Sequence, residues 1–73
     1  MLAQDQAHNL YRVQFRYQGL LSWRDSFFGT SFEDARANMN DELQRDPGVA
    51  EIELLVSHPE LEWKTVYAVS RHY

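Results

Sequence analysis

Between Asn9 and Gln18, apolar and polar residues alternate without a break. Side chains along a β-strand point to opposite faces with a period of two, so this stretch predicts a half-buried strand. Its core face carries Tyr11, Val13, Phe15 and Tyr17. Its solvent face carries Arg12, Gln14, Arg16 and Gln18. Because the two arginines are like charges on one face, they need a partner, and the functional question is what that partner is.

Three further stretches predict strands, each with one apolar face. A strand over 21–28 follows the turn signal Gln18-Gly19 and places Leu21, Trp23 and Phe27 on one face. A strand over 49–58 turns inward Ala50, Ile52, Leu54 and Val56. A strand over 61–70 faces the core with Leu61, Trp63, Tyr67 and Val69.

A helix is predicted between the second and third strands. Thr30 with Glu33, or Ser31 with Asp34, fits a capping box at its start. Asp46-Pro47-Gly48 ends it, since proline cannot continue a helix and glycine tolerates the exit turn. A single apolar stripe recurs at helical spacing and consists of Phe32, Ala35, Met39 and Leu43.

These elements predict a two-layer α+β fold with the order ββαββ. One helix covers one face of a four-stranded antiparallel sheet, whose predicted spatial order is 2-1-3-4. Residues 9–73 form the single domain and residues 1–8 a flexible tail. Asp25 falls on the apolar face of an edge strand, where an inward charge discourages aggregation; a functional acid is the alternative.

Composition narrows the function. The chain has 73 residues, 44% of them hydrophobic, and no cysteine, so we expect a small globular domain without disulfides in a reducing compartment such as the cytoplasm. We expect no signal peptide and no membrane span. With three glycines there is no phosphate-cradling loop, and no nucleophile–histidine–acid order is recognisable, so we predict no enzyme, catalytic residue or cofactor. His58 and His72 lie too far apart along the predicted strands to share a metal ion. His8 could approach His58, but two histidines with Glu60 are a poor ligand set, so we expect no metal site.

Three surfaces are candidates for binding. If the strands over 9–18 and 49–58 are neighbours, Arg12 and Arg16 lie opposite Glu51 and Glu53 as a charge ladder. Alternatively, the arginines form a basic track for RNA together with Arg24 and Lys64. The net charge of −4 disfavours that alternative. Reversing Arg12 and Arg16 to Glu separates the two: a ladder loses stability, whereas a contact surface loses binding.

The second surface is the exposed side of the helix, with Asp34, Asn38, Asp41 and Arg45 flanked by Glu33 and Glu42. It is either a solvated face, with Asp41 and Arg45 paired, or an acidic ridge for a basic protein. The third is an apolar patch on the sheet face away from the helix, made of Leu20, Phe28, Leu55, Val66 and Ala68. Ordinary scatter, burial by the N-terminal tail, or a homodimer through the strand over 61–70 or the Leu55–Val66 patch would also explain it.

The strand-rich first half followed by T-S-F-E-D-A (Thr30 to Ala35) resembles small phage-encoded proteins that bind host machinery. The nearest in shape are the RNA polymerase inhibitors of lytic phages, and small anti-CRISPR proteins share the general look. The resemblance covers residues 9–58 and implies a protein that occludes or tethers a larger host complex in the host cytoplasm. An RNA-binding or regulatory module is the alternative. The residues expected to contact the partner are Arg12, Arg16, Arg24, Asp34, Asp41, Leu55 and Val66.

Overall fold

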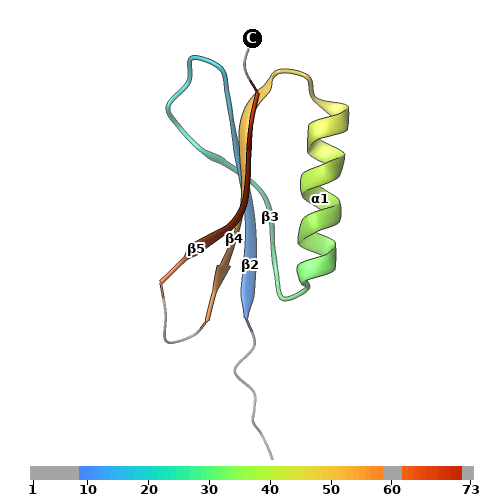
Figure 1. Ribbon diagram of the computed structural model, residues 1–73, viewed down its shortest axis with the longest axis vertical. Coiled ribbons are helices and arrows are strands. Elements are labelled where there is room, and N and C mark those ends of the chain that lie inside the picture. Colours follow the sequence, from blue (N-terminus) through green and yellow to red (C-terminus); the bar gives the residue numbers. More distant parts are fainter. Residues whose placement is uncertain (1–8, 59–61, 72–73) are drawn as a thin grey trace, which may run out of the picture.

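A computed structural model describes residues 9–58 and 62–71 of the chain. Four strands and one helix follow in the order β2 (Leu10–Tyr17), β3 (Arg24–Gly29), α1 (Phe32–Arg45), β4 (Val49–Ser57) and β5 (Lys64–Ser70). The strands form one antiparallel sheet in the order β3-β2-β4-β5. Figure 1 shows α1 on one side of this sheet. The predicted α+β fold, with its spatial order 2-1-3-4, is confirmed.

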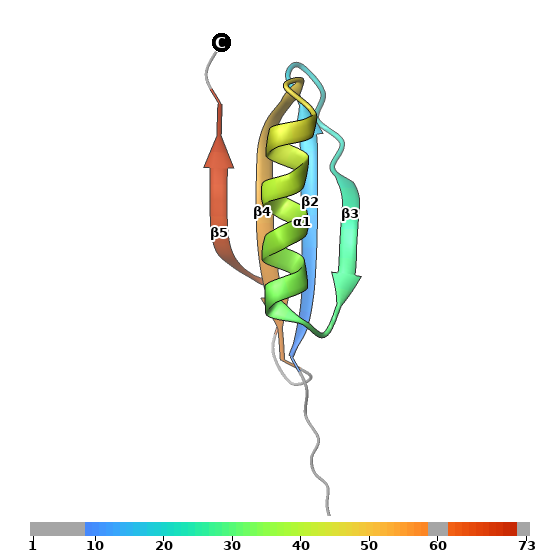
Figure 2. The same ribbon diagram turned by 90° about the vertical axis from the view of Figure 1, so that its right-hand side faces the viewer.

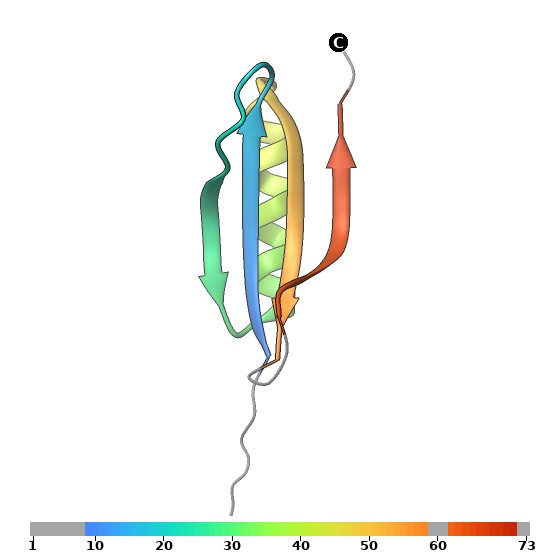
Figure 3. The same ribbon diagram turned by 90° about the vertical axis from the view of Figure 1, so that its left-hand side faces the viewer.

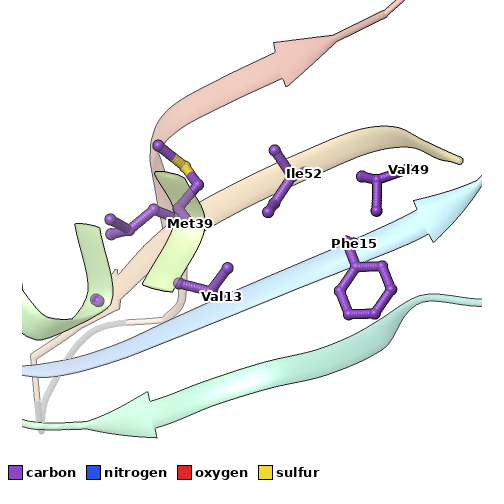
Figure 4. Packing of buried hydrophobic residues seen from close by; sticks show 7 residues of the cluster. Val13, Phe15, Met39, Val49 and Ile52 are labelled. Atoms are coloured by element: carbon purple, nitrogen blue, oxygen red, sulfur yellow. The ribbon is translucent and has the colours of Figure 1, made fainter. Parts of the chain in front are cut away.

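The core lies between α1 and the two central strands, β2 and β4. Val13, Phe15, Ile52 and Leu54 from the strands pack against Ala35 and Met39 of the helix (Figure 4). Tyr11, Tyr17, Phe27, Phe32 and Leu43 close the margins of this cluster. The alternation in β2 and the stripe on the helix therefore predict the core correctly, because burial follows the periods of strand and helix.

The two ends of α1 are fixed by different groups. Ser31 is the N-cap, and its side-chain oxygen accepts a hydrogen bond from the Asp34 N–H at 3.1 Å, so the second of the two predicted caps is used. At the other end the Arg71 guanidinium donates to the carbonyls of Leu43 and Asp46. A cation at a helix C-terminus also complements the helix dipole.

Three register shifts in the sheet displace residues from the faces that simple alternation predicts. The shift beside Val13 turns Asp25 onto the face away from α1, where its carboxylate accepts from Arg12, so the prediction of an inward Asp25 is wrong. The shift beside Arg16 buries Val49 completely in the core. Trp63 lies beyond the shift beside Leu54 in the pairing of β4 with β5. Its ring contacts Phe28 and Arg12 instead of the core.

Two strand starts and one helix residue also differ from expectation. β3 begins at Arg24, not at residue 21, and β5 begins at Lys64; Leu61 and the tail over 1–8 lie outside the described residues. Glu42, expected at the margin of the exposed helix face, is 9% exposed and accepts a hydrogen bond from Arg45. A buried carboxylate is tolerable when it is paired in this way.

Candidate protein-binding surface

The sheet face away from α1, here called the outer face, is not covered by any described element (Figure 3). β2 runs along the middle of the outer face. Its three consecutive outward positions are Arg12, Gln14 and Arg16. We call their side-chain contacts the polar ladder, because each of the three bonds to an acidic side chain of a neighbouring strand.

In the polar ladder, both arginines are paired with carboxylates of the same chain. Arg12 donates to both carboxylate oxygens of Asp25 on β3, at 2.9 and 3.3 Å. Gln14 donates to Glu53 on β4 at 3.0 Å, and Arg16 donates to Glu51. The predicted pairing of Arg16 with Glu51 is confirmed. The expected pairing of Arg12 with a β4 glutamate is wrong, because Leu55 stands opposite Arg12 in the register.

Each arginine of the ladder also lies against a tryptophan ring. The Arg12 guanidinium is 5.7 Å from the ring centroid of Trp63, and that of Arg16 is 4.5 Å from Trp23. Trp23 belongs to the connection between β2 and β3, and Trp63 immediately precedes β5. A cation over an aromatic face gains about 0.5–1 kcal/mol at exposed sites. A carboxylate and a ring therefore hold each guanidinium in place.

The apolar side chains of the outer face gather at its two ends. At one end, the rings of Phe28 and Trp63 meet edge-on with centroids 6.0 Å apart, although they come from opposite edges of the sheet. We call them the aromatic pair; Phe28 remains 64% exposed and Trp63 36%. Leu55 lies in the same row as Phe28, with Arg12 between them. Val66, 43% exposed, follows at the register shift beside Leu55.

At the other end, the connection between β2 and β3 leans toward the outer face (Figure 1). Gly19, with a positive φ of 82°, makes the turn in which the Leu20 N–H bonds to the Tyr17 carbonyl. The connection exposes Leu20 and Leu21, the latter by 86%. An open hollow of about 420 Å³ lies beside them and reaches Arg16, Glu51 and Arg71. Both ends of the outer face thus present apolar groups, with a paired polar strip between them.

The structure brings some of the predicted site residues together and separates others. Arg12, Arg16, Leu55 and Val66 share the outer face. Arg24 lies instead over the ring of Tyr17, a core-margin residue, at 5.7 Å, and Lys64 stands opposite Val56. The proposed basic track of Arg12, Arg16, Arg24 and Lys64 is therefore broken, because its last two members leave the outer face.

The helix candidates lie on the other side of the sheet. Asp34 supplies the N–H of the cap, and Asp41 forms an i, i+4 ion pair with Arg45 at 2.9 Å, as predicted. Sequence reasoning missed the roles of Trp23 and Trp63 on the outer face. The signal was that both large rings stand beside turn regions, where they can fold over a neighbouring face instead of entering the core.

A separate polar corner fixes the end of β2 against the turn after α1. The Tyr17 hydroxyl donates to the Asp46 carboxylate at 2.7 Å, and the Gly48 N–H donates to its other oxygen at 3.0 Å. These hydrogen bonds lower the pKa of Asp46, and the bond to Asp46 raises the pKa of Tyr17. The corner is structural, because it joins three elements at the edge of the core.

Within the part of the chain that the structure describes, histidines and carboxylates form no cluster of the size a metal ion needs. No helix among the described residues is long and apolar enough to cross a membrane. Comparison of the chain with protein-family models, curated proteins and solved structures found no match.

Proposed function

We propose that this chain is a non-enzymatic protein-binding module whose binding surface is the outer face. One observation carries the proposal: the aromatic pair, Phe28 with Trp63, stays substantially exposed beside guanidiniums that are already bonded within the chain. Large exposed apolar groups rimmed by polar ones mark protein contacts. Tryptophan and arginine are also the residue types that most often dominate binding energy at interfaces.

The chemistry of the outer face defines the partner. The aromatic pair offers apolar area at one end, and Leu20 with Leu21 offers it at the other. Between them the polar ladder presents carboxylates and guanidiniums whose mutual bonds hold them in fixed positions. A folded protein with two apolar side chains flanking a mixed polar strip would complement this face, and the module would occlude or tether that protein. A host complex bound by a phage-type inhibitor is the narrower form of the proposal and rests on the resemblance alone.

RNA is the second candidate, because rings and arginines on an open sheet can stack bases. The charge on the outer face speaks against it. Asp25, Glu51 and Glu53 outnumber Arg12 and Arg16 there, and both arginines already bind carboxylates. A phosphate backbone would have to displace these bonds and approach the remaining negative charge. The excess of carboxylates on the outer face and the existing pairing of both arginines therefore favour a protein over RNA as the partner.

Affinity capture from a bacterial lysate, split into nuclease-treated and untreated halves, tests the proposal. The baits are the unchanged chain, Phe28→Ala, and Asp41→Ala as a matched control on the exposed helix face. We expect a stoichiometric protein that survives nuclease, is retained by Asp41→Ala and is lost from Phe28→Ala, while circular dichroism shows both variants folded. Retention that collapses with nuclease moves the function to RNA. Equal capture by all three baits rejects the outer face as the binding surface.

A further inference from the structure

The second half of β5, residues 67–70, is an edge without the usual protection. All seven residues of β5 are exposed, including the apolar side chains of Val66, Tyr67 and Val69. Its one charged residue, Lys64, and its register shift lie in its first half, so residues 67–70 carry no charge, proline or register shift. The opposite edge, β3, carries the charges of Arg24 and Asp25 and a register shift in the middle of its six residues, which are devices that block strand addition. The longer regular and uncharged edge, which can accept another strand, is therefore the second half of β5.

The helix leaves β5 uncovered on its side of the sheet. α1 packs against β2, β3 and β4, and Figure 2 shows β5 standing beside it. Phe32 and Arg36 reach across to the Tyr67 ring, with centroid distances of 6.2 and 5.8 Å. Tyr67 and Val69 nevertheless remain 42% and 37% exposed. An added strand would extend the sheet beside the helix, and its side chains would cover part of Tyr67 and Val69.

The direction of the backbone groups in β5 follows from one hydrogen bond. The Arg71 N–H donates to the Ala50 carbonyl of β4 at 2.7 Å. Because the backbone groups of successive strand residues point to opposite edges, those of Val69 and Tyr67 also point toward β4. The N–H and C=O groups of Ala68 and Ser70 therefore point away from the sheet. The register is regular across this stretch, since the shift falls beyond Tyr67.

We infer that β5 pairs antiparallel with β5 of a second copy of this chain, about a two-fold axis through Val69. In this register Ala68 of each copy lies opposite Ser70 of the other, so every outward backbone group of these residues finds a partner. Val69 meets its own counterpart at a close, non-hydrogen-bonded position. An axis through Ala68 would instead oppose Ser70 to the irregular backbone at Val66. The two sheets would become continuous.

The side chains permit this pairing. Between Tyr67 and Arg71 the charged residue is Arg71, and its guanidinium is bonded to the carbonyls of Leu43 and Asp46. No free like charges are therefore brought face to face. A contact through one short strand buries less than the roughly 1,000 Å² of a stable interface, so we expect a weak dimer whose population depends on concentration. The edge of β5 is a different surface from the outer face, and self-pairing there does not depend on the proposed function.

Cysteine crosslinking tests the axis, because the chain contains no cysteine of its own. Single variants Tyr67→Cys and Val69→Cys are oxidised mildly at about 100 μM protein, with Phe28→Cys, an exposed position on the other edge, as the collisional control. At the axis the two Cα atoms would be about 4.5 Å apart, within disulfide range, so Val69→Cys should crosslink at least about tenfold faster than the others. Similar rates at the three positions would overturn the inference.

Sedimentation equilibrium gives a second, independent readout. Ala68→Pro removes an N–H that points away from β4, so it should weaken dimerisation by at least about tenfold while β5 stays in its own sheet. Val69→Lys, which opposes two ammonium groups at the axis, serves if the proline variant does not fold. Phe28→Ala should dimerise like the unchanged chain, which separates this result from that of the capture experiment. A chain that is monomeric at 100 μM, or one that captures a different protein through β5, would refute self-pairing.

Discussion

Arg16 provides the most direct test of the polar ladder, through the substitution Arg16→Glu. The Arg16 side chain is 27% exposed and bonds Glu51 across the β2–β4 pair while stacking on Trp23. A cross-strand ion pair contributes about 0.2–1 kcal/mol, and two like charges in its place destabilise by a similar amount. Loss of the cation–π contact adds about 0.5–1 kcal/mol. We expect the free energy of unfolding to fall by about 1–3 kcal/mol.

Urea denaturation followed by far-UV circular dichroism measures this change. Urea m-values of small domains are about 1–3 kcal/mol per M, so a loss of 1 kcal/mol lowers the urea midpoint by about 0.3–1 M, which is easily resolved. Gln18→Glu, at an exposed position just after β2, controls for added negative charge. The double variant Arg16→Glu with Glu51→Arg should regain about 0.5–2 kcal/mol, because it restores opposite charges across the same strand pair.

Two outcomes of these measurements would contradict the role assigned to Arg16. If Arg16→Glu unfolds within about 0.5 kcal/mol of the unchanged chain but loses its partner, Arg16 acts as a binding contact and the ladder contributes little. If the charge swap restores nothing, the destabilisation comes from packing on Trp23 and not from the ion pair. Either result would change which part of the outer face is assigned to stability.

Three further predictions concern the scaffold. Arg71→Met should cost about 1–2 kcal/mol, because it strips cationic donors from the last carbonyls of α1; it is measured by urea denaturation, and an unchanged midpoint would contradict it. The free energy of unfolding should decline as pH falls below about 4. The hydrogen bond from Tyr17 is the main reason why the pKa of Asp46 is lower in the folded state than in the unfolded state. Ionised Asp46 therefore stabilises the fold above the unfolded-state pKa, and this contribution is lost as the carboxylate is protonated. Asp46→Asn should flatten this part of the acid limb in thermal melts at pH 2–6, and an unchanged slope would exclude Asp46 as a source. Ile52→Ala, at a fully buried position, should cost about 2–5 kcal/mol, enough to leave much of the chain unfolded at 37 °C by circular dichroism.

Periodicity predicted the element order, the core of β2 and the helix stripe, because these segments keep one period from end to end. It failed at Asp25, Val49 and Trp63, and each failure lies beyond a register shift. One extra residue on one strand of a pair exchanges the two faces for everything that follows. Each shift also lies beside two consecutive apolar residues, such as Val49-Ala50. Such doublets were the available signal, since strict alternation cannot bury both members.

The charged residues show a different limit. The sequence indicated that Arg12 and Arg16 need partners. Arg12 bonds to Asp25, whose side chain simple alternation had placed on the wrong face of the sheet. The positions of Trp23 and Trp63 depend on how two connections fold back over the outer face, and strand periods say nothing about connections. The candidate surface was therefore predicted by its central strand, and its two ends became visible only in three dimensions.

The exposure of β5 could not have been predicted from its pattern. Alternation indicates which face of the sheet a side chain lies on, but not whether another element covers that face. Tyr67 and Val69 lie on the helix side, as predicted, yet remain substantially exposed. The reason is geometric: a helix about 10 Å across cannot cover four strands spaced about 4.8 Å apart. In the described part of the chain there is one helix, and the apolar side chains of the strand beyond its reach stay partly exposed. The same pattern that predicts a core residue in β2 therefore leaves apolar area in β5 that a second copy of the chain would cover in the pairing inferred above.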